Sequence, residues 1–234
     1  MTLPTIVLVA GFGDTCSVFE PLLGTKLAQT YNLAAIDLPG FGAPPLAGRT
    51  TLERLAEFVD TQARRRGATR VLAHSVASIT ASLAALRAGS SIDTILSLEG
   101  NLTADDAYFS GMAAAFVSPD EFRSAFLVRL GDLARNDVNI ERYRSAVEGA
   151  DAQALWELGV DAHALSAAQT PGDLLAKTQR AVYFYNPANL SAASLAWLQK
   201  STLERICLPG TSHWKCFDQP ELLAERIIEK AGTG

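Results

Sequence analysis

The chain has 234 residues, of which 48% are hydrophobic and 19% are charged, and its formal net charge is -5. This length can bury a sizeable core as one domain with a smaller subdomain. The charge is modest and scattered, which excludes an electrostatic case for binding nucleic acid or an anionic membrane surface. No apolar run approaches the ~20 residues that are needed to span a bilayer.

The cysteines and histidines form no metal or disulfide pattern. The three cysteines are an odd number without framework spacing, and the sequence enters an apolar segment at once, without a secretory leader. Both features favour a reducing, cytoplasmic location. The three histidines (His74, His163 and His213) lie far apart in sequence, so we expect no metal site.

The first hundred residues alternate between strand-type and helix-type segments. Residues 5–10 are β-branched and continuously apolar, as in a strand buried on both faces of a parallel sheet. The further elements predicted in this part are helix 17–30, strand 33–36, helix 51–66, a strand ending at His74, an alanine-rich helix to Ala88, and strand 94–98. This alternation predicts an α/β protein with a mostly parallel sheet flanked by helices.

Residues 102–178 break the alternation, because they contain several helix-type segments and no convincing strand. Helix starts are marked at Ser118-Pro119, near Asn139, at Asp151 and at Thr170-Pro171. Strands are expected again at 181–185 and 205–208, and a last helix at Pro220. We therefore expect a core formed by residues 1–101 and 179–234, with an all-helical subdomain at 102–178.

A serine stands where the strand ending at His74 gives way to a helix, in the segment Ala73-His74-Ser75-Val76-Ala77. A strand, a serine in a tight turn and a helix form the nucleophile elbow, written G-x-S-x-G. Both glycines are alanines here, and a methyl group is the smallest side chain that such a crowded turn can accept. Ser75 is therefore the candidate nucleophile.

Three further segments give the chain a family resemblance. They are Val9-Ala10-Gly11-Phe12-Gly13, Asp37-Leu38-Pro39-Gly40-Phe41-Gly42 and Gly210-Thr211-Ser212-His213-Trp214. With the elbow, and in this order, they make nearly the whole sequence resemble the α/β-hydrolase superfamily. The resemblance implies an α/β-hydrolase fold in which residues 102–178 form the lid over the active site. It says little about the substrate.

The resemblance also implies a base and an acid. A serine needs a base to remove its proton, and His213 has the position of the family's catalytic histidine. Most of the superfamily supplies the acid after the strand that follows the lid, but that strand is followed here by Asn186 and Asn189. Some members take the acid from the strand just after the nucleophile, where this chain has Glu99. The expected triad is Ser75, His213 and Glu99, with the lid residues Asp105 and Asp106 as alternative acids.

The oxyanion hole is expected from two backbone N–H groups, those of Phe12 in the glycine loop and of Val76 after the nucleophile. Ala10 stands where the family usually has a histidine that braces this loop. An apolar substrate pocket is expected to include three aromatic residues: Phe122, Phe126 and Trp214.

Together these features predict a cofactor-independent serine hydrolase that cleaves a carboxylic ester or related acyl compound through an acyl-enzyme. Its partner would be a small acyl substrate with an apolar part. The same site could instead hydrolyse a C–C bond, a lactone or a thioester, or transfer an acyl group. A slow-turnover ligand-binding receptor of the same fold is a further alternative. Halide removal is disfavoured, because it needs a carboxylate at the position of Ser75.

Overall fold

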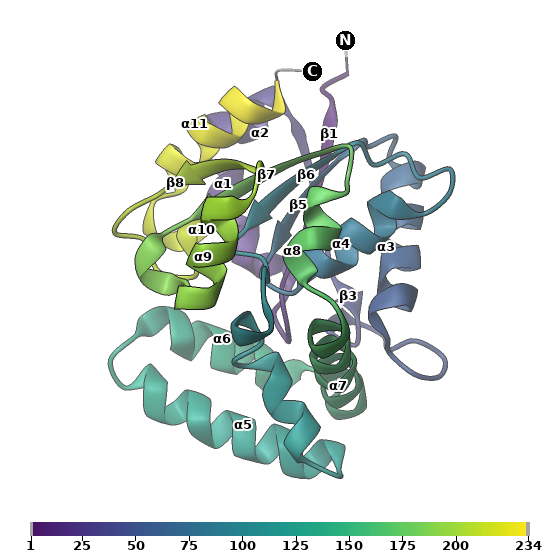
Figure 1. Cartoon of the computed structure of the whole chain (residues 1–234), viewed down its shortest axis with the longest axis vertical. Helices are drawn as coiled ribbons and strands as arrows, with labels where there is room; N and C mark the ends of the chain where they lie inside the picture. The colour runs from purple at the N-terminus through teal and green to yellow at the C-terminus, as the bar shows by residue number, and fades with distance from the viewer. Residues whose placement is uncertain (1, 233–234) are drawn as a thin grey trace.

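The computed structural model describes residues 2–232, and its centre is a six-stranded, fully parallel sheet with the strand order β2-β1-β5-β6-β7-β8 (Figure 1). The strands are β1 (Thr5–Val9), β2 (Asn32–Ile36), β5 (Arg70–His74), β6 (Thr94–Leu98), β7 (Arg180–Tyr185) and β8 (Glu204–Cys207). A separate short pair consists of β3 (Leu38–Pro39) and β4 (Gly42–Ala43). The predicted fold class is confirmed.

Helices cover both faces of the sheet. On one face, α3 (Leu52–Arg65) packs against α4 (Ala77–Leu86), which also contacts α8 (Pro171–Ala176). The other face carries α1 (Glu20–Leu23), α2 (Lys26–Thr30), α10 (Lys215–Asp218) and α11 (Pro220–Ala231), and α9 (Ala192–Lys200) follows β7. Within residues 2–232, no helix is both long enough and apolar enough to cross a membrane.

The sequence explains why the sheet is central. Residues 6–9 of β1 are all fully buried, as the unbroken apolar run predicts for a strand covered on both faces. The helix predicted over 17–30 is instead divided into the 3₁₀ turn η1 (Cys16–Phe19), α1 and α2. The break falls at Gly24 and Thr25, because the Thr25 side chain accepts a hydrogen bond from Leu27 N and starts a new helix.

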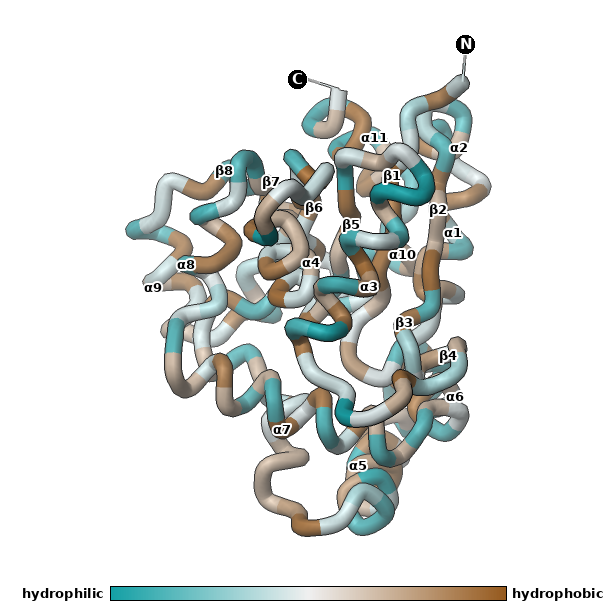
Figure 2. The backbone as a smooth tube through the Cα atoms, turned by 90° about the vertical axis from the view of Figure 1, so that its right-hand side faces the viewer, coloured by the Kyte–Doolittle hydropathy of each residue, from teal (hydrophilic) through white to brown (hydrophobic). Residues whose placement is uncertain are grey.

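Between β6 and β7 the described chain is entirely helical. Its elements are η2 (Ala104–Asp106), η3 (Ser110–Ala115), α5 (Pro119–Ala134), α6 (Val138–Gly149), α7 (Ala152–Ala168) and α8. Ser118, Asp137 and Asp151 cap α5, α6 and α7 with their side chains. Brown and teal alternate along α5 and α7 in Figure 2, as expected for helices with one apolar face.

The helices α5, α6 and α7, called the roof helices below, lie together beyond the carboxyl ends of the strands (Figure 1). The α8 helix does not join them, because it packs against α4 beside the sheet. The loops that follow β1, β5, β6 and β8 therefore open toward the roof helices. Sites in open α/β sheets form at this edge.

Candidate active site

Ser75 lies in a strained turn between β5 and α4. Its φ angle is +56°, and the only other described non-glycine residue with a positive φ is Glu99, at +42°. Such angles cost on the order of 1–3 kcal/mol and are concentrated at functional sites. A Cβ atom added to Gly11 would lie 2.9 Å from Ser75 Cβ, so only glycine lets this loop come so close.

The two elbow positions leave room only for small side chains, which is why alanine is found there. Ala73 and Ala77 are both fully buried. On the other side of α4, a Cβ atom added to Gly100 would lie 2.1 Å from Ser78 Oγ. In this chain the close approach to α4 is thus made by a glycine that follows β6.

His213 and Glu99 come from different loops and meet beside the elbow. His213 Nδ1 lies 3.0 Å from Glu99 Oε2, and the Glu99 side chain is only 2% exposed. Burial raises the pKa of Glu99, but the contacts with His213 and Lys215 outweigh burial and hold the pKa below its usual value. An ionised carboxylate accepts a hydrogen bond from Nδ1–H, and this leaves Nε2 of His213 as the nitrogen that can accept a proton.

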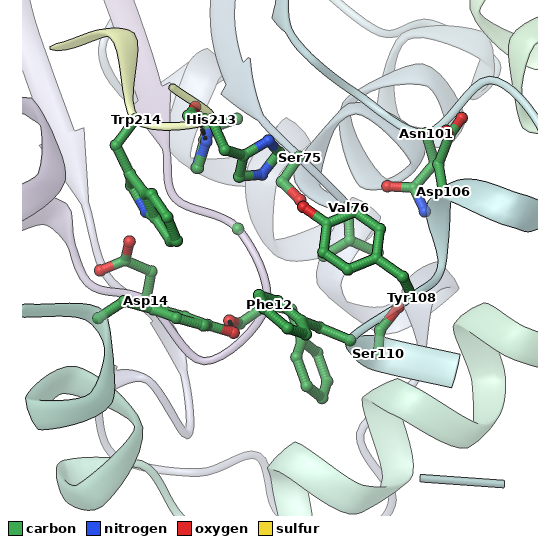
Figure 3. A pocket seen from close by; sticks show the side chains of 14 residues that line it. Phe12, Asp14, Ser75, Val76, Asn101, Asp106, Tyr108, Ser110, His213 and Trp214 are labelled. Carbon is green, nitrogen blue, oxygen red and sulfur yellow. Dashed lines mark hydrogen bonds between the residues drawn. The ribbon is translucent and has the colours of Figure 1, made fainter. Parts of the chain in front are cut away.

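Ser75 and His213 line the same pocket, and Figure 3 shows both with Tyr108 at one end of it. The described residues contain no hydrogen bond between the Ser75 hydroxyl and His213. Catalytic hydrogen bonds are often long without substrate and shorten in the complex. The arrangement therefore has the nucleophile and the base in one cavity, with the base already oriented by Glu99.

His74 supports the loop that carries His213. His74 Nε2 lies 3.1 Å from the His213 carbonyl oxygen, and the two rings are 4.6 Å apart. Burial lowers the pKa of His74 well below its usual value, and the nearby His213 contributes to this. The ring is therefore neutral and donates from Nε2, which gives His74 a packing role.

The two expected oxyanion donors are free to bind a ligand. In the described chain, no hydrogen bond uses the N–H of Phe12 or of Val76. Both residues line the pocket around Ser75 (Figure 3). Val76 also precedes the first turn of α4, where the helix dipole favours negative charge.

The glycine loop is braced from α6. Tyr143 donates a hydrogen bond of 2.6 Å to the carbonyl oxygen of Phe12. Its neighbour Arg142 holds the buried Asp14 through two hydrogen bonds of 2.9 and 2.7 Å. These contacts connect the glycine loop, which also contains Ala10, to α6.

A pocket lies over Ser75. Five aromatic residues form part of its wall: Phe12, Tyr108, Phe109, Tyr143 and Trp214. Among residues 2–232, no group of three or more His, Cys, Asp or Glu side chains is arranged to hold a metal ion. The pocket thus combines apolar surface with a few polar groups, as ligand sites usually do.

Of the three residues expected in the substrate pocket, Trp214 lines the pocket over Ser75, whereas Phe122 and Phe126 do not. Both phenylalanines are fully buried and are absent from the pocket wall. Their rings stack on each other at 5.5 Å and pack against Phe12 at 6.2 and 5.9 Å. They lie behind the wall because α5 needs its apolar face to pack against the loop and the other roof helices.

Several site residues have no signal in the sequence. Tyr108 lies beside the candidate triad, with its ring 6.3 Å from that of His213. Asn101 lines the pocket, and its buried Nδ2 has no partner in the described chain. Lys215 is buried against Glu99, and only its place two residues after His213 could have suggested a role.

The chain belongs to the alpha/beta hydrolase family, whose profile matches residues 6–226. A search of curated proteins finds no match. Solved structures with this fold include an esterase from Thermogutta terrifontis, with 16% identity and a TM-score of 0.73 over 99% of this chain and 90% of that one. An enol-lactonase from Burkholderia xenovorans has 16% identity and a TM-score of 0.72, with 98% and 91% covered.

Enzymes of a different reaction class also have this fold. A 1H-3-hydroxy-4-oxoquinoline 2,4-dioxygenase matches with 14% identity and a TM-score of 0.77, covering 97% of this chain and 91% of that one. At such identities the similarity establishes the fold alone. The reaction must be argued from the residues of the site.

Proposed function

We propose that this hydrolase is a cofactor-independent serine hydrolase that cleaves a carboxylic ester or a related acyl compound. Ser75 attacks the carbonyl carbon while His213 removes its proton, and Glu99 stabilises the imidazolium that forms. The N–H groups of Phe12 and Val76 stabilise the oxyanion. His213 then gives this proton to the leaving group as the tetrahedral intermediate collapses to the acyl-enzyme, and it acts again as the base when water hydrolyses the acyl-enzyme.

One observation carries this proposal. The 3.0 Å hydrogen bond between His213 Nδ1 and the buried Glu99 lies in the pocket region that also contains the strained Ser75. A general base needs a partner that fixes its tautomer, and this contact provides one. Two unpaired backbone N–H groups at the same pocket supply what acyl transfer needs in addition.

We propose further that the substrate is a small acyl compound with an apolar part, and that the roof helices act as a lid. The aromatic residues of the wall support the first statement, and the second is supported by Tyr143, which reaches the pocket from the roof helix α6. Under this proposal, the roof helices determine which acyl or leaving groups fit. The three free cysteines (Cys16, Cys207 and Cys216) are compatible with a cytoplasmic location.

The test combines labelling with turnover. A serine-directed phosphonate should modify Ser75 alone, and this modification should abolish hydrolysis of a p-nitrophenyl ester series. Ser75→Ala should lower turnover by on the order of 10⁶, with the melting temperature as the control for folding. Labelling at another residue, with esterase activity intact, would contradict the proposal.

The alternatives give different results in the same experiment. The ester series is extended with a lactone and a thioester, which test those two reactions. A nucleophilic alcohol is added as an acyl acceptor, which tests acyl transfer. A C–C bond hydrolase would cleave a β-diketone faster than any ester. A receptor would bind its ligand in calorimetry without turnover.

A further inference from the structure

Lys215 is a buried cation in direct contact with the candidate acid. Its Nζ donates a hydrogen bond to Glu99 Oε1 and another, of 3.1 Å, to the carbonyl oxygen of Ser212. The Lys215 side chain has no exposed surface. Burial lowers the pKa of Lys215, and the carboxylate of Glu99 opposes this shift. An ammonium group is rarely buried unless it is paired, so the contact with Glu99 explains its position.

The two oxygens of Glu99 have different partners. Oε2 faces His213, whereas Oε1 receives Lys215 and, at 2.8 Å, the backbone N–H of Asn186. Asn189 Nδ2 reaches both oxygens, at 3.0 and 3.2 Å. The carboxylate is thus held between the lysine and the histidine, and it cannot rotate away from His213 without losing the ion pair.

We infer that Lys215 is a positioning residue that fixes Glu99 against His213 and, through its charge, makes the Glu99–His213 pair a weaker base. This inference rests on the proposed function. Before reaction, the negative charge of Glu99 and the positive charge of Lys215 cancel, and the imidazole of His213 carries no charge. When the proton of Ser75 Oγ moves to His213 Nε2, the group becomes positive overall, whereas without Lys215 it would become neutral.

Two consequences follow from this charge balance. His213 accepts the serine proton less readily than it would beside an unpaired carboxylate. Once protonated, it also passes its proton more readily to the leaving group as the acyl-enzyme forms. Lys215 itself gains and loses no proton.

Other titratable groups also face His213, and they are the same in every variant proposed here. The rings of His74 on β5 and Tyr108 after β6 lie against its ring, and Asp14 and Asp106 line pockets that it also lines. Arg142 on α6 acts on the neighbouring His74, and Asp218 on α10 accepts a hydrogen bond from the N–H of Ser212. A difference between variants at position 215 therefore reports on Lys215 alone.

The test measures the rate of Ser75 phosphonylation against pH by intact-protein mass spectrometry, which needs no knowledge of the substrate. The variants are Lys215→Met, which removes charge and donor, and Lys215→Gln, which removes the charge but keeps a donor. Both should move the half-maximal rate to a higher pH, by about one to two pH units. Lys26→Met, at an exposed position of α2, is the control and should leave the pH of the half-maximal rate unchanged. At the pH of maximal rate, Ser75 should be phosphonylated faster in Lys215→Gln than in Lys215→Met, because glutamine keeps a hydrogen-bond donor for Glu99.

A melting comparison covers the case in which Lys215→Met does not fold. Glu99→Gln leaves the buried ammonium unpaired, whereas the double variant Glu99→Gln/Lys215→Met buries two neutral side chains. The double variant should melt at the higher temperature. If Glu99→Gln melts as high as the double variant, the inferred coupling is wrong.

The two proposals fail in distinguishable ways. A wild-type protein that is not labelled at Ser75 contradicts the proposed function, and the melting comparison still tests the contact between Lys215 and Glu99. A wild-type protein that is labelled, with the same pH midpoint in Lys215→Met and Lys215→Gln, overturns the inference about Lys215 alone.

Discussion

The hydrogen bond from Tyr143 to the Phe12 carbonyl links a roof helix to the oxyanion loop, and Tyr143→Phe removes only this bond. Burial raises the pKa of Tyr143 well above its usual value, so the hydroxyl remains a donor. No other described donor reaches Phe12 O, which makes the expected loss of stability about 2 kcal/mol. For a chain of this length, that loss corresponds to a fall in melting temperature of roughly 4–8 °C.

The same substitution should slow the reaction. Complete removal of an oxyanion donor costs about 10²–10³ in turnover, so a loosened loop should cost less, roughly tenfold in kcat. The fall should be equal across an ester series, because the oxyanion is common to all substrates. Tyr31→Phe, at the opposite end of the sheet just before β2, is the matched control. Reduced stability with unchanged kcat in Tyr143→Phe would refute the proposed coupling.

Two other substitutions test the assignments made here. Glu99→Gln removes the charge that stabilises the imidazolium, so turnover should fall by roughly 10⁴, measured below the melting temperature of the variant; near wild-type turnover would exclude Glu99 as the acid. Phe126→Ala removes a fully buried ring, so it should lower the free energy of unfolding by about 3–5 kcal/mol, measured in urea, and leave the substrate preference unchanged. A changed substrate preference with an unchanged free energy of unfolding would indicate that Phe126 lines the substrate pocket.

Local patterns predicted the sheet because each strand has its own signal. Short, largely apolar runs marked β1, β6 and β7 as strands. The turn residues between these runs limited where each strand could begin and end. Ser75 and Glu99 could be proposed for the same reason, since each directly follows a strand. In a parallel sheet the residues after adjacent strands must lie at one edge, so the order of elements already brings them near each other.

The contacts between helices could not be predicted in this way. Periodicity identified an apolar face on α5, but it did not show whether Phe122 and Phe126 face a cavity or other side chains. The bond between Tyr143 and Phe12 joins residues 131 positions apart, and no local pattern encodes it. Contacts of this kind depend on how the roof helices pack, which a single sequence leaves open.

The position of the acid explains two asparagines whose role was not evident from the sequence. Most of the superfamily places the carboxylate after the strand that follows the lid, and here that place is taken by Asn186 and Asn189. Neither can stabilise an imidazolium by charge, but both donate hydrogen bonds to Glu99, one from the backbone and one from the side chain. Asn186 Nδ2 and Asn189 Nδ2 also donate to the Thr211 carbonyl, at 2.6 and 3.1 Å, two residues before His213. The loop after β7 thus holds both the candidate acid and the segment that carries the candidate base.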